Sequence, residues 1–426
     1  MTVTIFLGSL LGTMALGMPI AFALMLSGVA LMIHLDLFDS QIVAQTVVNG
    51  ADSFPLMAVP FFMLAGEVMN SGGLSRRIVN VAVALVGHIR GGLGFVVILA
   101  ACVMASLSGS AVADAAALSA LLMPMMLKSG HDPARAGGLI ASASIIGPII
   151  PPSIGFILFG VVGGVSITKL FLAGIAPGLM IAAALCLAWL VVSRREQAAL
   201  PPRQSARQRL AAFVDSLWAL LLPAIIVAGL RFGIFTPTEA GVVAAVYSLF
   251  VAMVIYRELS LAQLFHVFVA AAEVTSVVMF LVAAAGVSAW LITVADLPGE
   301  LAAMLAPFMD RPVLLMALMM VVLFAVGTAM DMTPTILILT PVLLPVAEQA
   351  GIDPVYFGVL FIINASIGLI TPPVGTVLNV VCGVSRLSME RLMVGVMPFL
   401  IAEVAVMMLF VLFPGLVTVP AGWFAR

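Results

Sequence analysis

Long apolar runs recur along the whole chain, and they restrict it to one class of fold. Only 8% of the 426 residues are charged, against about 25% in a typical soluble domain, too few to cover the surface of a soluble protein. Because the runs are continuous and not short and alternating, they indicate membrane-spanning helices and not a β-barrel. We therefore expect an all-α polytopic membrane protein. The runs of about 18 residues or more include 5–33, 170–192, 240–256, 275–294 and 395–414.

The first run, 5–33, has no basic segment before it and no clear cleavage site, so we interpret it as the first spanning helix and not as a signal peptide. Cys102, Cys186 and Cys382 lie singly in apolar segments and have no disulfide or metal spacing, which favours buried structural thiols. The net charge of −2 points to no nucleic-acid partner. No Walker motif, HExxH motif or paired catalytic residues occur, so we expect neither ATP hydrolysis nor any other enzyme activity.

Basic residues accumulate in cytoplasmic loops of membrane proteins, and here they form four groups. The acidic turns 34–40 and 348–353 contain no Lys or Arg, so we place them outside the cell membrane. We place the basic groups inside. They are the linker 193–209 with Arg194, Arg195, Arg203, Arg207 and Arg209; Arg76, Arg77, His88 and Arg90; Lys128, His131 and Arg135; and Arg386 and Arg391.

Special residues recur at one spacing in the two halves of the chain. Asp-Pro pairs at 132–133 and 353–354 are each followed by a glycine, Gly147 or Gly368, and then by a proline pair. The first Asp-Pro lies among basic residues and the second among acidic ones, which indicates an inverted-topology repeat, the usual architecture of secondary transporters. We therefore predict a first repeat over 1–192, a cytoplasmic linker over 193–215 and a second repeat over 216–426.

Two long apolar segments, about 95–126 and 313–345, are interrupted in the middle by small polar residues. Each half has about 15 residues, or about 22 Å of helix, which is shorter than the hydrocarbon core of about 30 Å. We expect two re-entrant helical hairpins, and an ordinary kinked helix remains the alternative. The amphipathic segment 74–92 and its counterpart 297–312 are expected to lie along the membrane interface beside the hairpins.

The proline pairs Pro151-Pro152 and Pro372-Pro373 break two apolar helices, because proline has no N–H and collides with the preceding turn. Irregular backbone at membrane depth is tolerated where protein buries it or where it lines a cavity. Carbonyl oxygens released at such breaks suit an alkali cation, and the N-termini of half-helices favour an anion. The sequence therefore predicts a sodium ion beside an anionic substrate.

Four motifs give the chain a family resemblance: "SLSGSAVAD" at 106–114, "GPIIPPS" at 147–153, "FTPTEAG" at 235–241 and "GLITPPVGT" at 368–376. With them, essentially the full chain resembles the large membrane subunit of tripartite ATP-independent periplasmic (TRAP) transporters. The resemblance implies an elevator-type, sodium-coupled importer of a small organic anion, a sugar acid or a dicarboxylate, in the bacterial inner membrane. It also implies two partners, a small membrane subunit and a periplasmic solute-binding protein, and no cofactor except sodium as the coupling ion.

The resemblance also implies site residues, with sodium held mainly by backbone carbonyls. The first sodium site would comprise Ser106, Ser108, Ser110, Asp114, Gly147, Ile150 and Pro152, and the second Gly327, Ala329, Asp331, Gly368, Thr371 and Pro373. The substrate would lie between the hairpin tips, against Ser108, Gly109, Ser110, Pro152, Ser153, Thr328, Thr333 and Pro373.

Several alternatives remain open from the residues alone. Asp114 and Asp331 are either helix N-caps or cation ligands. Glu67, Glu239 and Glu273 are expected near helix ends or in polar stretches, in interfacial or structural roles. The alternative function is a cation exchanger or channel that carries no organic substrate.

Overall fold

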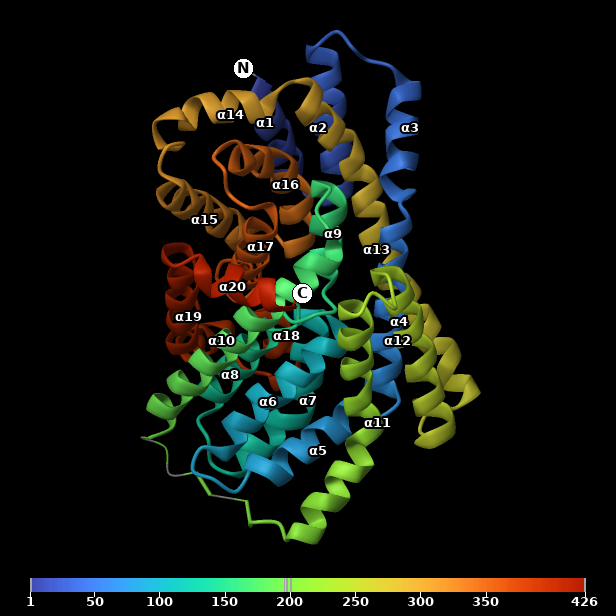
Figure 1. The fold of residues 1–426 in the computed structure, drawn as a ribbon, viewed down its shortest axis with the longest axis vertical. Coiled ribbons are helices and arrows are strands. Elements are labelled where there is room, and N and C mark those ends of the chain that lie inside the picture. Colours follow the sequence, from blue (N-terminus) through green and yellow to red (C-terminus); the bar gives the residue numbers. More distant parts are fainter. Residues whose placement is uncertain (1, 195, 197, 200, 425–426) are drawn as a thin grey trace.

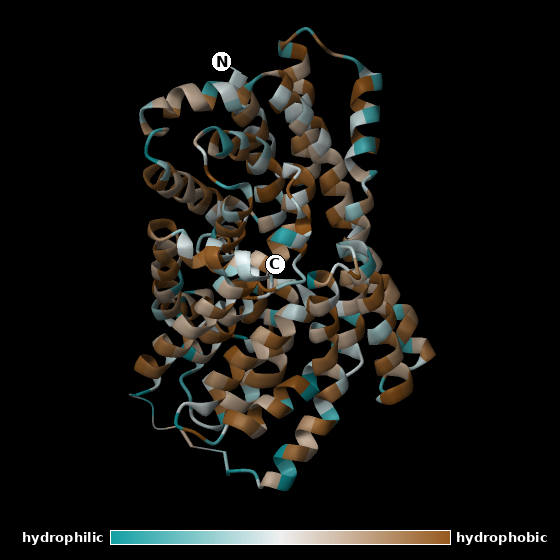
Figure 2. Cartoon of the chain, in the orientation of Figure 1, coloured by the Kyte–Doolittle hydropathy of each residue, from teal (hydrophilic) through white to brown (hydrophobic). Residues whose placement is uncertain are grey.

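The computed structural model describes residues 2–194, 196, 198–199 and 201–424. Arg195 of the basic linker therefore lies outside the described residues. Over the described part the chain is helical and contains no strand (Figure 1). Nine of the described helices are long and apolar enough to cross a membrane. Apolar residues run along most helices, and hydrophilic residues gather in the linker at one end and in loops at the other (Figure 2). The expected all-α membrane fold is confirmed.

The helices have the following bounds. The first half contains α1 (Thr2–Ala15), α2 (Ile20–His34), α3 (Ser40–Ala51), η1 (Phe54–Met57), α4 (Ala58–Ser71), α5 (Leu74–Val86), α6 (Gly92–Ser108), α7 (Ala111–Lys128), α8 (Pro133–Ser144), α9 (Ile154–Gly163) and α10 (Ile167–Ser193). The second half contains α11 (Ala206–Arg231), α12 (Pro237–Phe250), the π-helical turn η2 (Val251–Ile255), α13 (Leu261–Val294), α14 (Leu297–Leu305), η3 (Ala306–Phe308), α15 (Pro312–Ala329), α16 (Met332–Gln349), α17 (Pro354–Gly368), α18 (Thr376–Ser385), α19 (Met389–Leu412) and α20 (Gly415–Phe424).

The first apolar run is not one spanning helix, and that prediction is wrong. It forms α1 and α2, which contact each other. The chain turns between them at Gly17, which has φ of +84°, a conformation that glycine adopts readily. Pro19 then precedes α2 as its N-cap. With 14 and 15 residues, each helix is only about 21–23 Å long, shorter than the hydrocarbon core.

Two helical hairpins occupy opposite ends of the molecule, α6–α7 in the lower half of Figure 1 and α15–α16 in the upper half. The two helices of each hairpin pack against one another. Their 17 or 18 residues give about 26 Å of helix, longer than predicted. Helix length therefore does not distinguish a re-entrant hairpin from a spanning pair. A separate short helix, α5, precedes the first hairpin, and α14 followed by η3 precedes the second. Their position along the membrane interface remains a prediction.

A helix with an aspartate cap follows each hairpin. Asp132 caps α8 by accepting a hydrogen bond from Arg135 N at 2.9 Å, and Asp353 caps α17 by accepting one from Tyr356 N at 2.8 Å. Each capped helix then breaks and continues as a short helix, α9 or α18. Helix α9 packs against α16 of the second hairpin, and α18 packs against α7 of the first. The short helix after each break therefore packs against the hairpin of the other half. The inverted orientation of the repeat remains a prediction.

Candidate ion and substrate site

The first helix break spans residues 145–153, all of them buried. After α8 the backbone tightens into a short turn, in which Gly147 N donates to Ser144 O at 3.0 Å. Among the described residues no donor reaches the carbonyl oxygens of Gly147, Ile150 or Pro152. Pro151 and Pro152 contribute to this, because neither has an N–H. Three buried carbonyls at the predicted first sodium site are therefore left without hydrogen-bond partners.

The tip of the first hairpin touches this break at Gly109. Gly109 has φ of +60°, and a Cβ added there would lie 2.5 Å from the carbonyl oxygen of Pro152. A side chain of any size would separate the tip from the break. Glycine is therefore required here by both conformation and space.

Asp114 joins the hairpin tip to the break. Ser108 Oγ donates to Asp114 Oδ1 at 2.6 Å, and Ser110 N donates to Ser108 Oγ at 3.2 Å. The other carboxylate oxygen, Oδ2, is buried and has no hydrogen-bond partner in the described chain. It lies 2.7 Å from the position that a Cβ on Gly147 would take. A buried carboxylate oxygen without a donor, beside free carbonyls, is an arrangement that a cation would complete.

The N-cap interpretation of Asp114 is wrong. Ser110 is the N-cap of α7, and its Oγ accepts a hydrogen bond from Ala113 N at 3.4 Å. Asp114 lies in the first helical turn. Asp331 does occupy the N-cap position of α16, but its side chain makes no capping hydrogen bond. Instead, Asp331 Oδ1 accepts a hydrogen bond from Thr376 Oγ1 at 3.2 Å.

The second hairpin tip and the second break also touch. A Cβ added to Gly368 would lie 2.7 Å from Gly327 O. Val374 N donates to Thr328 O at 3.3 Å, so backbone joins backbone across the contact. Thr376 was missed as a site residue, although it is the last residue of the motif "GLITPPVGT". It connects the helix after the break to Asp331.

The two sites differ in exposure. The first tip and break are buried around Ser108 and Pro152, whereas Ala329 and Pro373 of the second site are exposed. The sites are connected through α9, because a Cβ added to Gly155 would lie 3.3 Å from Met332 Sδ at the start of α16.

Some predicted residues have their polar groups engaged locally. Ser106 Oγ donates to Val103 O at 2.6 Å within α6, and Thr371 Oγ1, in the second break, donates to Ile367 O of α17 at 2.8 Å. Ser153 Oγ donates to Pro148 O and accepts from Phe156 N at 3.2 Å, which caps α9. The hydroxyls of these three residues therefore have structural partners already. Thr333 is half-buried, and no described contact joins it to either break.

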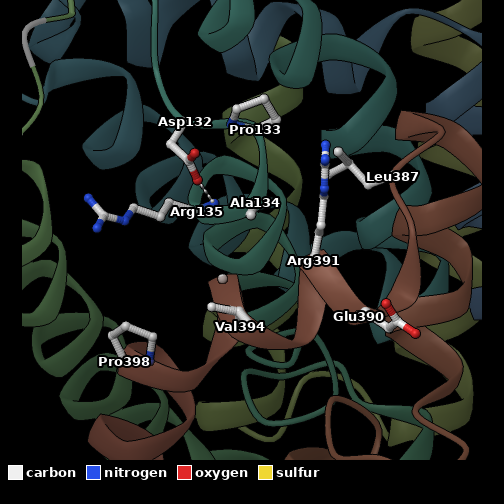
Figure 3. Close-up of a pocket in the computed structure, with 10 residues that line it drawn as sticks. Asp132, Pro133, Ala134, Arg135, Leu387, Glu390, Arg391, Val394 and Pro398 are labelled. Atoms are coloured by element: carbon white, nitrogen blue, oxygen red, sulfur yellow. Dashed lines mark hydrogen bonds between the residues drawn. The ribbon is translucent and has the colours of Figure 1, made fainter.

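A separate cavity of about 760 Å³ opens between the start of α8 and the start of α19 (Figure 3). Arg135 and Arg391 line it, together with Asp132 and Glu390. It contains no hairpin-tip or break residue. These arginines therefore belong to a different part of the molecule from the candidate ion sites.

Comparison with known proteins gives a family. Residues 7–416 match the family of the tripartite ATP-independent periplasmic transporter, DctM component. A 2,3-diketo-L-gulonate TRAP transporter large permease protein of Escherichia coli (strain K12) is 58% identical over 99% of this chain and 100% of its own length.

More distant relatives carry other solute names. A sialic acid TRAP transporter large permease protein of Vibrio cholerae is 38% identical over 95% of both chains. A C4-dicarboxylate TRAP transporter large permease protein of Pseudomonas aeruginosa is 37% identical over 82% of both.

The fold is also similar to a solved structure. The YdaH transporter of Alcanivorax borkumensis superposes with a TM-score of 0.65 at 16% identity, covering 89% of this chain and 90% of that one. The family and the nine candidate spans show a multi-pass protein of the bacterial inner membrane that is a permease and not an enzyme. The chain belongs to the DctM family, the large permeases of TRAP transporters.

Proposed function

We propose that this permease imports a sugar acid by symport with sodium. The observation that carries the proposal is the orphaned Oδ2 of Asp114, buried between the first hairpin tip and the free carbonyls of the first break. Oxygen donors of this kind suit a hard cation. The 58% identical relative, named for 2,3-diketo-L-gulonate, supports a sugar acid over the C4-dicarboxylate named for a more distant relative. The sialic acid named for another relative is itself a sugar acid.

The substrate carboxylate would lie between the two breaks, near the N-termini of α9 and α18. The first amides of a helix carry positive partial charge and favour an anion. Sodium bound at Asp114 and at the second break would add positive charge beside it. Binding of the anion and of the cations would therefore be mutually favourable, which is the physical basis of coupling.

Transport would proceed by movement of the hairpins and broken helices against helices α1–α4 and α11–α13, and the moving helices would carry the substrate. A periplasmic solute-binding protein would deliver the solute, and a small membrane subunit would complete the complex. The two halves would be inverted repeats, joined by the linker 193–215.

Uptake by the reconstituted three-protein complex tests this function. Labelled sugar acid should accumulate when sodium is outside and potassium inside, and not when potassium replaces sodium on both sides. Equal uptake in potassium, with no proton gradient in its place, would contradict sodium coupling. Sodium flux in the absence of any solute would favour the exchanger or channel. A thermal-shift screen of the binding protein against sugar acids and dicarboxylates identifies the solute class.

A further inference from the structure

The cavity of about 760 Å³ between the starts of α8 and α19 has no role in the proposed transport mechanism (Figure 3). The two helices touch beside it, because a Cβ added to Gly395 would collide with the carbonyl oxygen of Ala134. The guanidinium group of Arg135 lies 3.7 Å from Glu196 of the linker, so the cavity is at the linker end of the molecule. None of its lining residues belongs to the candidate ion or substrate sites.

Two arginines of the cavity have free hydrogen-bond donors. Arg391 is exposed, and its guanidinium group makes no hydrogen bond or ion pair within the described chain. The side chain of Arg135 is 40% exposed, and its ion pair with Glu196 is too long to be a hydrogen bond. Free N–H groups of a guanidinium match the oxygen atoms of a phosphate group.

Two carboxylates also line the cavity, and neither one pairs with Arg391. Asp132 accepts a hydrogen bond from the backbone N–H of Arg135 at 2.9 Å and so caps α8. Glu390 precedes Arg391 on α19, but the two side chains point in different directions in Figure 3. No ion pair of the described residues joins Arg391 to either carboxylate. Its positive charge is therefore available to an anion.

Arg391 lies at one end of a helix that is long enough to span the membrane. It is the third of the 24 residues of α19, one of the nine candidate spans. This helix is about 36 Å long, more than the hydrocarbon core of about 30 Å. The first turn of α19 is therefore expected at the membrane surface, where lipid head groups lie.

An exposed apolar stripe leads from the cavity along α19. Its members are separated by three, four or seven residues, so they share one face of the helix with Arg391. They are Val394, Met397, Ile401, Met408 and Leu412, with exposed fractions of 74%, 46%, 62%, 36% and 54%. A molecule that fits both features has an anionic head and a long apolar chain.

We propose that this cavity binds the phosphate head group of an anionic phospholipid at Arg135 and Arg391, with one acyl chain along the apolar stripe of α19. Basic pockets between spanning helices bind head groups of this kind. A free phosphate ion would match the arginines but would leave the stripe without an occupant. The proposal depends on neither sodium coupling nor the identity of the solute.

Lipid binding to the purified complex tests the head-group site without measuring transport. Native mass spectrometry follows lipid adducts during titration with phosphatidylglycerol or with phosphatidylcholine that has the same acyl chains. We expect phosphatidylglycerol to bind more tightly, and Arg391→Gln to weaken its binding about fivefold, the attraction of one basic residue to an anionic lipid surface. Arg386→Gln is the matched control, because Arg386 is exposed but does not line the cavity. Equal affinity of the two variants, or of the two lipids, would overturn the proposal.

Inorganic phosphate distinguishes a lipid site from a site for a free ion. Excess inorganic phosphate is added to the complex that carries bound phosphatidylglycerol, at constant ionic strength. We expect the lipid to remain bound, because the acyl chain also contributes to its affinity. Displacement of the lipid by inorganic phosphate, with no such loss in an equal concentration of chloride, would overturn the lipid assignment.

A photoreactive acyl chain tests the apolar stripe and needs no variant. Phosphatidylglycerol and phosphatidylcholine with the same photoreactive chain are compared in vesicles that contain the unchanged complex. We expect phosphatidylglycerol to give at least threefold more adduct on α19. Exposed apolar residues of α13, such as Val277 at 70% exposure, serve as the internal control and should react equally with both lipids. Equal labelling of α19 by the two lipids would overturn the proposal.

Discussion

At the scale of single residues, the first site depends on glycines that leave space and on one carboxylate oxygen that has no partner in the described chain. Gly109 and Gly147 let the backbones of the hairpin tip and the break approach Pro152 and Asp114. Ser108 satisfies one oxygen of Asp114 and leaves the other free. Substitutions at these positions therefore separate spatial effects from charge effects.

Gly109→Ala should lower transport at least about tenfold, because the new Cβ would collide with Pro152 O and push the tip away from the break. Gly164→Ala is the matched control. Gly164 also ends a helix in the left-handed region, with φ of +66°, but no atom lies within 4 Å of an added Cβ. Both variants bear a similar cost of about 1–2 kcal/mol for placing alanine in the left-handed region. Equal uptake by the two variants at equal expression would show that the close approach is unimportant.

Asp114→Asn should raise the sodium concentration for half-maximal uptake at least about tenfold, because it removes the charge and keeps the shape. The Ser108→Ala variant leaves the carboxylate in place and removes one hydrogen bond, so a smaller increase is expected. The measurement is uptake against sodium concentration at saturating solute. An unchanged sodium dependence in Asp114→Asn would mean that Asp114 is not a cation ligand.

At the scale of helices, the two breaks determine which carbonyls can hold a cation. The contacts of α5 determine how that helix is attached to the second half of the chain. Proline pairs follow α8 and α17 in the interior of the protein. In an unbroken helix the carbonyls there would accept hydrogen bonds from amides of the same helix. Helix α5 is bound to the second half by Arg77, which pairs with Glu258 at 2.7 Å and Asp215 at 3.2 Å. The Arg77 guanidinium also lies 3.7 Å from the centre of the Tyr256 ring.

Replacing either pair, Pro151-Pro152 or Pro372-Pro373, with alanine should let a continuous helix form. Alanine is about 3 kcal/mol more favourable than proline at a helix position, so we expect normal insertion. The carbonyls would bond to their own helix, and the sodium concentration for half-maximal uptake should rise before the solute affinity changes. Uptake against sodium at equal membrane expression measures this. Wild-type sodium dependence in both variants would place the ion site elsewhere.

Arg77→Gln should lower the free energy of unfolding by about 1–2 kcal/mol, because it leaves Glu258 and Asp215 without their shared cation. Arg76→Gln is the control. Arg76 also pairs with Glu258, but its side chain is 57% exposed, so we expect about 0.5 kcal/mol or less. Thermal unfolding of the purified protein compares the two variants. Equal midpoints would exclude Arg77 as the main attachment of α5.

At the scale of the whole molecule, orientation in the membrane follows from the distribution of charge. The basic linker lies at one end of the molecule, and the loop between α2 and α3 lies at the other (Figure 1). If basic residues face the cytoplasm, the first hairpin has its base inside and the second has its base outside. The two hairpin tips, each beside one candidate ion site, would then approach each other from opposite sides of the membrane.

Single-cysteine labelling tests this orientation in a variant that lacks Cys102, Cys186 and Cys382. We expect Ser205→Cys to react only with reagent applied from the cytoplasmic side. Glu348→Cys, at the base of the second hairpin, should react only from the periplasmic side. Both positions are exposed. The reverse pattern would invert the topology of both halves.

Features that depend on local chemistry were predictable from the sequence. Long apolar runs identified the membrane class, the Asp-Pro pairs marked the starts of α8 and α17, and the proline pairs marked both breaks. Each of these follows from properties of a few consecutive residues: hydropathy, capping and the missing N–H of proline. Three of the four motifs that indicated the family lie at those breaks and tips, and the fourth, "FTPTEAG", forms the capped start of α12.

Other features were decided only by tertiary structure. The contact of Gly109 with Pro152 and the hydrogen bond of Thr376 to Asp331 join residues more than 40 positions apart, and no local pattern encodes which of many small residues will meet. The exposure of Glu273 was equally hidden, because a carboxylate in an apolar run looks the same whether it faces the core or the lipid. Packing between distant helices determines these facts, and packing depends on the whole chain at once.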